Sequence, residues 1–221
     1  IGTAIRPRLT SLISQSKIEE MQLLYKKATQ FVSVIGFAVT GTVAIFSTEL
    51  LYAWTGDMQA ALWAGNILFW YALGNGLLMI LAFQYYLQFA YGNLKYHIWG
   101  NTIFGFVQII VMIIAVYTYG ALGAGIAWFT LQAIFLSFWP GYIHSKFAKG
   151  IHKNWMFKDV LPMMFSTIVI LVAIKNINID FFSFGRVELF LILLLIGGMV
   201  LIINSLVASE VRNMILKRLN K

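Results

Sequence analysis

Cysteine is absent from the 221 residues of this sequence, and this absence excludes a disulfide framework, a thiolate metal site and a cysteine nucleophile. Charged residues are also scarce, at 11% of the chain, whereas an average soluble domain contains about 25%. Hydrophobic residues make up 60%, and the mean hydropathy is +0.81. A soluble domain of this composition could not cover its surface with polar groups, so the sequence predicts an integral membrane protein.

Acidic residues are outnumbered by basic ones, 8 against 16, which gives a net charge of +8. In a soluble protein such a charge would point to a nucleic-acid partner. Here the basic residues occur in short runs between apolar stretches, which is typical of the cytoplasmic loops of a membrane protein. We therefore expect no nucleic-acid partner.

Long apolar runs predict an all-α integral membrane protein with six transmembrane helices. A transmembrane helix needs about 20 predominantly apolar residues. Apart from Glu188, the sequence is free of charged residues over the windows 28–48, 58–94, 96–145, 160–174 and 187–209. The window 96–145 is too long for one span, and we expect it to break at Thr118-Tyr119-Gly120 into helices near 97–117 and 121–143.

The basic residues predict how these spans are oriented. Two of the sixteen, Lys175 and Arg186, lie in the segments 49–60, 118–120 and 175–188. The other fourteen lie in the alternate segments, which are 1–27, 91–97, 144–159 and 210–221. Basic residues that flank transmembrane helices are concentrated on the cytoplasmic side, so we expect both ends of this chain in the cytoplasm.

Three parts are expected along the chain. Residues 1–27 form a cytoplasmic amphipathic segment, because apolar residues recur at helical spacing over 8–27 with lysine and glutamate between them. Residues 28–145 form four transmembrane helices, and residues 146–221 form two additional transmembrane helices and a basic cytoplasmic tail that ends at Lys221. The chain begins without an initiator methionine or a signal peptide, so we expect it to be the C-terminal portion of a longer polypeptide.

Ionisable residues are nearly absent from the middle of the predicted spans. Such a residue would be the first candidate for a functional role inside the membrane. The chain also offers no pair of acids suited to general acid–base catalysis. Its histidines, His97, His144 and His152, lie in or beside predicted cytoplasmic loops without the spacing of metal ligands. We therefore expect no enzyme active site, no metal and no other cofactor.

Uncharged polar side chains inside the spans are the remaining candidates for a site. The candidate substrate-cavity residues are Asn66, Asn75, Gln84, Gln88, Tyr91, Asn101 and Gln108. One interpretation is hydrogen bonding between helices, worth about 0.6 kcal/mol for each bond. The other is a water-filled cavity whose amides and phenols contact sugar hydroxyls. Gln132 is a further polar residue, inside the fourth predicted span.

The helical period assigns faces to these residues. In the second span Gln84 shares a side with Asn66, because 18 residues make five turns, and Asn75 falls on the opposite side. At the cytoplasmic junction of the second and third spans, Lys95 and His97 have two interpretations. They mark the topology alone, or they attract an anionic headgroup such as a lipid pyrophosphate.

Several stretches resemble the C-terminal part of polysaccharide (O-antigen-type) flippases of the MOP exporter superfamily, which also contains lipid II flippases and MATE exporters. The stretches that carry this resemblance are 6–10 (RPRLT), 23–29 (LLYKKAT), 51–57 (LYAWTGD), 71–76 (YALGNG), 85–92 (YYLQFAYG) and 120–125 (GALGAG). Their order and spacing cover residues 1–145. The last third of the chain resembles the family mainly in hydropathy.

The resemblance implies the C-terminal part of a MATE/MOP-like two-lobe transporter bundle, in which residues 28–145 belong to the second lobe. It implies flipping of an undecaprenyl-diphosphate-linked oligosaccharide across the bacterial inner membrane by alternating access, for surface polysaccharide biosynthesis. The implied partners are that lipid-linked oligosaccharide, membrane lipids and the N-terminal half of the same transporter, which this sequence lacks. A polysaccharide polymerase is a further candidate partner.

Three alternatives remain open. A MATE-like exporter of small cations or drugs would share the fold but is disfavoured by the lack of acidic residues in the spans. A membrane-embedded enzyme of glycan assembly would need a large catalytic loop, whereas the longest interior loop, 144–159, has about 16 residues. A non-catalytic membrane subunit of a glycan-assembly complex is the third.

Overall fold

The computed structural model describes residues 2–177 and 179–219, and this part of the chain is helical and contains no strand. Lys221, the last basic residue of the predicted cytoplasmic tail, lies outside the described residues. The helices are α1 (Gly2–Ser14), α2 (Ile18–Ile45), α3 (Ser47–Thr55), α4 (Met58–Ala90), α5 (Lys95–Phe147), α6 (Ile151–Asn154), α7 (Leu161–Lys175), α8 (Arg186–Val207) and α9 (Ser209–Leu219). A π-helical turn, Trp155–Val160, joins α6 to α7, so these three elements form one continuous rod.

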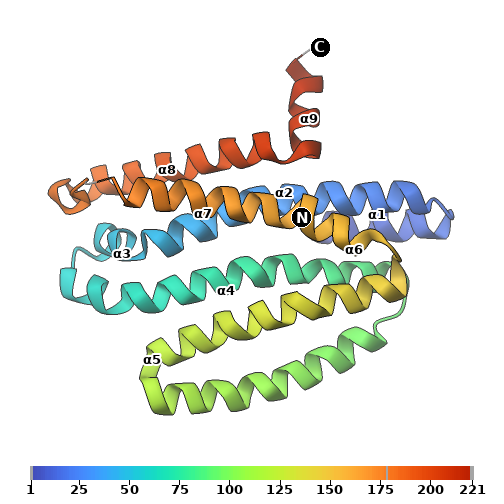
Figure 1. The fold of residues 1–221 in the computed structure, drawn as a ribbon, viewed down its shortest axis with the longest axis horizontal. Coiled ribbons are helices and arrows are strands. Elements are labelled where there is room, and N and C mark those ends of the chain that lie inside the picture. The colour runs from blue at the N-terminus through green and yellow to red at the C-terminus, as the bar shows by residue number, and fades with distance from the viewer. Residues whose placement is uncertain (1, 178, 220–221) are drawn as a thin grey trace.

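Five helical segments are long and apolar enough to cross a membrane, namely α2, α4, α5, the rod from Ile151 to Lys175, and α8. They run side by side along one axis (Figure 1), which indicates a multi-pass membrane protein. We call the end of the bundle that holds Gly120 the Gly120 end. The opposite end, which holds the loop between α4 and α5, is called the Asn93 end.

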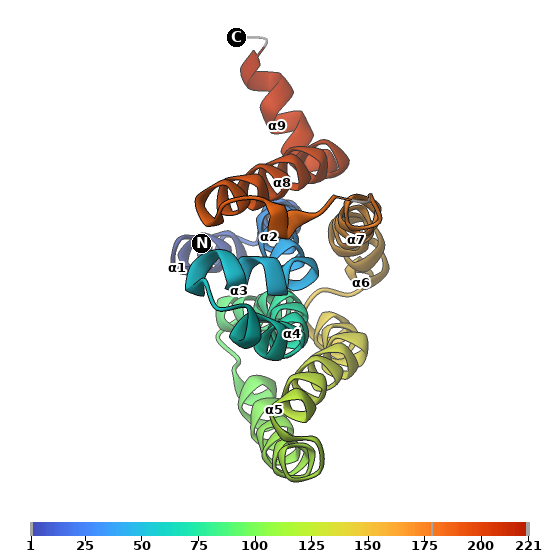
Figure 2. The same ribbon diagram turned by 90° about the vertical axis from the view of Figure 1, so that its left-hand side faces the viewer.

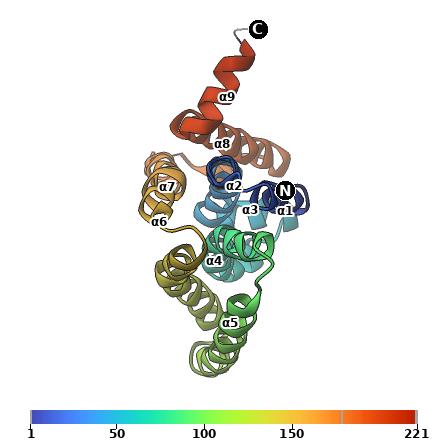
Figure 3. The same cartoon turned by 90° about the vertical axis from the view of Figure 1, so that its right-hand side faces the viewer.

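Helix α2 occupies the centre of the bundle. Seen end-on, it is surrounded by α1, α4, α7 and α8 (Figures 2 and 3). One buried apolar cluster joins α2 to α1, α4 and the end of α5, around Tyr25, Phe83 and Trp155. A second cluster joins α2 to α3, α7 and α8, around Phe46 and Leu189. Helix α2 is therefore the element that most of the other helices contact.

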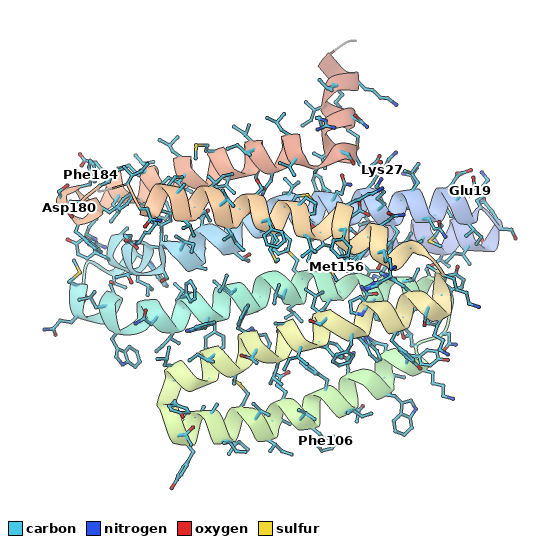
Figure 4. The ribbon with its side chains drawn as sticks, in the orientation of Figure 1. Glu19, Lys27, Phe106, Met156, Asp180 and Phe184 are labelled. Atoms are coloured by element: carbon cyan, nitrogen blue, oxygen red, sulfur yellow. The ribbon has the colours of Figure 1, made fainter. Side chains whose placement is uncertain are left out.

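Helix α5 turns back on itself at Gly120, where φ is 61° and ψ is −150°. This backbone conformation is accessible essentially only to glycine. The two arms of α5, 95–119 and 121–147, run antiparallel in the outermost layer of the bundle (Figure 1). The break predicted at Thr118-Tyr119-Gly120 is confirmed. On the first arm Phe106 points away from the bundle (Figure 4) and is largely exposed, as a side chain in contact with lipid would be.

The N-terminal segment differs from the prediction of one amphipathic helix over 8–27. A turn at Gln15–Lys17 divides it between α1 and α2, and Ser16 there has a positive φ of 59°. The apolar positions face the interior of the protein as expected, because Leu9 and Met21 are fully buried. Helices α1 and α2 pack against each other and against α4, so α1 and the start of α2 form a helical hairpin at the Asn93 end.

Substituting Gly120 by alanine tests the reversal of α5. A Cβ added at Gly120 or at Gly105 meets no atom within 4 Å, so the two sites differ in backbone conformation and not in available space. We expect Gly120→Ala to lower the free energy of unfolding by about 1–3 kcal/mol, and Gly105→Ala to leave it unchanged or slightly higher. Thermal unfolding of both variants in detergent measures this. Equal effects at the two positions would contradict the assigned turn.

Candidate functional site

A cavity of about 360 Å³ lies between α4 and both arms of α5. We call it the amide cavity, because its polar lining consists largely of amide side chains. Asn75 and Gln84 come from α4, Asn101 from the first arm of α5 and Gln132 from the second arm. No residue that lines it is an aspartate, glutamate, lysine or arginine.

Two of these amides are buried without partners. Gln84 is 1% exposed and Gln132 is 2% exposed. Both polar atoms of the Gln84 amide and Oε1 of Gln132 lack a hydrogen bond. The Tyr25 hydroxyl lies near Gln84, but it is hydrogen-bonded to His144 Nε2 at 3.0 Å. Leaving a buried amide unpaired costs about 1–3 kcal/mol, so these side chains are matched to water or a ligand in the cavity.

The wall formed by the start of α5 carries a second polar group. His97 and Asn101 lie one turn apart, and Asn101 Nδ2 donates to His97 Nδ1 at 2.8 Å. The His97 ring packs on Tyr85 with a centroid distance of 4.6 Å. Arg6 of α1 donates from Nη1 to the Tyr85 hydroxyl at 3.3 Å. A cationic guanidinium is thus held beside the Asn93 end of the cavity without lining it.

Aromatic rings line the cavity beside the amides of both arms of α5. Phe104 of the first arm stacks on Phe135 of the second with a centroid distance of 4.3 Å and an interplanar angle of 23°. Phe135 stacks in turn on Trp139, at 5.2 Å and 15°. The cavity therefore combines neutral hydrogen-bonding groups with an apolar aromatic lining, which is the usual composition of a small-molecule site.

The structure brings together four of the nine predicted site residues, namely Asn75, Gln84, Asn101 and His97. Asn75 and Gln84 were expected on opposite sides of their helix but in one cavity, and both line the amide cavity. The cavity reaches more than one side of α4, because it extends between that helix and both arms of α5.

The other five predicted residues lie elsewhere. Gln88 is buried and donates from Nε2 to the Gln84 carbonyl at 3.1 Å. Tyr91 packs on Phe147 at the end of α5. Asn66 and Lys95 are exposed, and Gln108 is half-buried on the first arm without lining the cavity.

The aromatic half of the cavity was not predicted, and Gln132 was noted only as a polar residue within its span. The sequence nevertheless contains a pattern that could have indicated this part of the cavity, because Gln132, Phe135 and Trp139 are separated by three and four residues. Such spacing places them on one helical face. The pattern is indistinguishable from an ordinary packing stripe until the facing residues, Asn101 and Phe104, are known.

Two carboxylates are buried outside the cavity. Glu49 was expected in a loop, but it lies on α3, is buried, and forms an ion pair with Lys175 of α7. Asp159 is buried in the π-helical turn and accepts a hydrogen bond from Gln30 Nε2 at 2.6 Å. Each carboxylate has a partner on another element, so both connect helices and neither lines the amide cavity.

A second polar cluster lies at the Asn93 end, and its polar groups are paired with one another. His144, at the end of α5, lies 3.2 Å from His152 through their Nδ1 atoms and is also bonded to Tyr25. Trp155 Nε1 donates to Thr29 Oγ1 at 2.9 Å. His144 is buried within α5 rather than placed in a loop. This pairing joins α2 to α5 and α6, and it contrasts with the unpaired amides of the cavity.

Comparison with protein-family models, with curated proteins and with solved structures found no match to this chain. The function is therefore argued from the amide cavity itself. Its lining, its burial and its lack of charged residues are the properties that a ligand would have to complement.

Replacing Gln132 by leucine tests whether its amide belongs to a site or to the packing. Because Oε1 is buried and unpaired, we expect Gln132→Leu to raise the free energy of unfolding by about 1 kcal/mol. The matched control is Gln30→Leu, which leaves Asp159 without its partner and should lower it by about 1–3 kcal/mol. Thermal unfolding in detergent measures both. A loss at Gln132 as large as that at Gln30 would identify it as an interhelical hydrogen-bonding residue.

Proposed function

We propose that this chain is the C-terminal part of a flippase that moves an undecaprenyl-diphosphate-linked oligosaccharide across the bacterial inner membrane. It acts as a transporter and not as an enzyme. The observation that carries the proposal is the amide cavity, in which Gln84 and Gln132 are buried without partners beside stacked aromatic rings. The resemblance of residues 1–145 to polysaccharide flippases supports it independently.

A sugar suits the lining of this cavity. Its hydroxyls are neutral groups that both donate and accept hydrogen bonds, and an amide side chain does the same. Its C–H groups are apolar and suit the aromatic part of the lining, which Phe104, Phe135 and Trp139 form. The same cavity would bind a sugar analogue that lacks a hydroxyl more weakly, because a buried amide would then be left unpaired.

The diphosphate has a matching position at the Asn93 end of the cavity. Arg6 is bonded to Tyr85 there, beside the ring of His97, and Lys95 begins α5 two residues before His97. Cationic groups near the membrane surface attract an anionic headgroup. In this proposal the headgroup lies between Arg6 and His97 while the first sugars reach the amides of Gln84 and Gln132.

A small organic cation fits the same cavity less well. Cation exporters and proton-coupled carriers need carboxylates in the membrane, and the buried carboxylates Glu49 and Asp159 are engaged elsewhere. A MATE-like activity therefore has no anionic group in the amide cavity to support it.

The proposed topology has six spans, with the two arms of α5 counted separately and both ends of the chain in the cytoplasm. Because the native chain contains no cysteine, single cysteines report the side on which a residue lies. We expect Tyr119→Cys and Ser183→Cys to react with a membrane-impermeant maleimide in intact cells. Asn93→Cys and Ser145→Cys should react only after permeabilisation. The reverse pattern, or reaction of all four in intact cells, would overturn the topology.

Deleting the intact gene from its own bacterium tests the transport function. We expect loss of surface polysaccharide and accumulation of lipid-linked oligosaccharide on the cytoplasmic face, both reversed by the wild-type gene. Gln84→Leu and Gln132→Leu should lower recovery by about tenfold, since each removes a hydrogen bond to the sugar. Gln59→Leu, an exposed amide on α4 outside the cavity, should restore it fully.

Unchanged surface polysaccharide in the deletion strain would refute the flippase proposal. New sensitivity to cationic drugs in that strain would favour the MATE-like exporter instead. Full recovery by both cavity variants at normal protein levels would leave the amide cavity without a role in transport.

A further inference from the structure

Helix α9 runs across the axis of the bundle and extends away from it (Figures 1 and 2). Its direction is set where α8 ends, because Ala208 adopts an extended conformation with φ −72° and ψ 105° between the two helices. Beyond α8 and α2, the described residues provide no substantial packing for α9. Its distal turns therefore project from the protein at nearly a right angle to the membrane-spanning helices.

The first turn of α9 is fixed to α2 by three polar contacts. The Glu210 backbone N–H donates to Gln30 Oε1 at 2.7 Å, and Gln30 Nε2 donates to Ser209 Oγ at 3.2 Å. The Glu210 carboxylate pairs with Lys26 at 3.2 Å. These contacts fix the angle of α9 and neutralise its acidic residue.

The two faces of α9 differ in polarity. Val211 and Ile215 lie four residues apart, on one helical face. Val211 is buried against the bundle, whereas Ile215 is 42% exposed. Asn213, Met214 and Lys217, toward the other side, border a groove with Lys27 of α2, and Lys27 is seen beside the base of α9 (Figure 4).

Charge on α9 is positive. Arg212, Lys217 and Arg218 are exposed, and Arg212 donates from Nη1 to the Leu206 carbonyl at 3.0 Å, at the end of α8. A cation in that position also interacts favourably with the C-terminal end of the α8 dipole. An apolar strip beside basic residues, on a helix perpendicular to the spans, matches the properties of interfacial membrane helices.

We propose that α9 lies on the surface of the bilayer and binds anionic phospholipid. Ile215 enters the boundary between headgroups and acyl chains, and Lys217 and Arg218 contact lipid phosphates. Charge complementarity favours this occupant over a soluble protein, because anionic lipid attracts each nearby lysine or arginine. The proposal requires only that the long helices lie in a membrane, and it does not depend on the transported substrate.

Fluorophores on single cysteines test the position of α9 in vesicles. The whole protein is labelled at Ile215→Cys or Asn213→Cys with a polarity-sensitive dye. It is then reconstituted in phosphatidylcholine with or without phosphatidylglycerol, and with spin-labelled lipid as quencher. In phosphatidylglycerol vesicles we expect at least twofold stronger quenching at 215 than at 213, together with a blue shift at 215 only.

The contribution of charge is tested by the double variant K217Q/R218Q on the Ile215→Cys background, in which Arg212 keeps its bond to the end of α8. We expect it to lose at least half of the quenching in phosphatidylglycerol vesicles while thermal unfolding stays the same. Quenching at neither position would place α9 in water, and equal quenching at both would remove the assigned lipid-facing side; either result would overturn the proposal. Quenching that is the same with and without phosphatidylglycerol would overturn the anionic-lipid assignment.

Discussion

The polar stripe on α2 is the interaction on which the rest of the bundle depends. Its members, spaced along one side of the central helix, are Tyr25, Thr29, Gln30 and Ser33. Tyr25 bonds to His144 of α5, whereas Thr29, Gln30 and Ser33 all bond to the π-helical turn, at Trp155 and Asp159. Gln30 also bonds to the start of α9. In lipid, apolar helices gain little from packing on one another rather than on acyl chains. Specific polar pairs therefore determine which helices associate and at what depth.

Buried glutamine side chains have two different roles in this bundle. Gln30 is fully paired and holds three segments together, whereas Gln84 and Gln132 are buried and unpaired. This difference, together with their place in the cavity, distinguishes Gln84 and Gln132 from the structural polar residues of the bundle. It also explains why a cavity lined by no carboxylate, lysine or arginine remains the strongest functional candidate.

Much of the fold could be predicted from the sequence, because apolar length and glycine position are local properties. The long helices and the reversal at Gly120 are of this kind. The break between α1 and α2 could not be predicted, since no proline or glycine marks Gln15–Lys17 and the apolar spacing continues through it. Glu49 was misplaced because its partner, Lys175, is distant in sequence. About half of the predicted site residues line the cavity, and the missing half depends on which helices face α4.

The helices around the amide cavity are not all held by the same kind of contact. The elements around α2 are joined by the polar stripe, whereas the exposed first arm of α5 is held by apolar stacking such as that of Phe104 on Phe135. Acyl chains can replace contacts of that kind at little cost. In the proposed flippase, a wall held by such contacts would serve as a lateral gate, through which a ligand anchored in the bilayer would enter from the side. The polar contacts of α2 would meanwhile stay in place, so that the gate would open without unfolding the bundle.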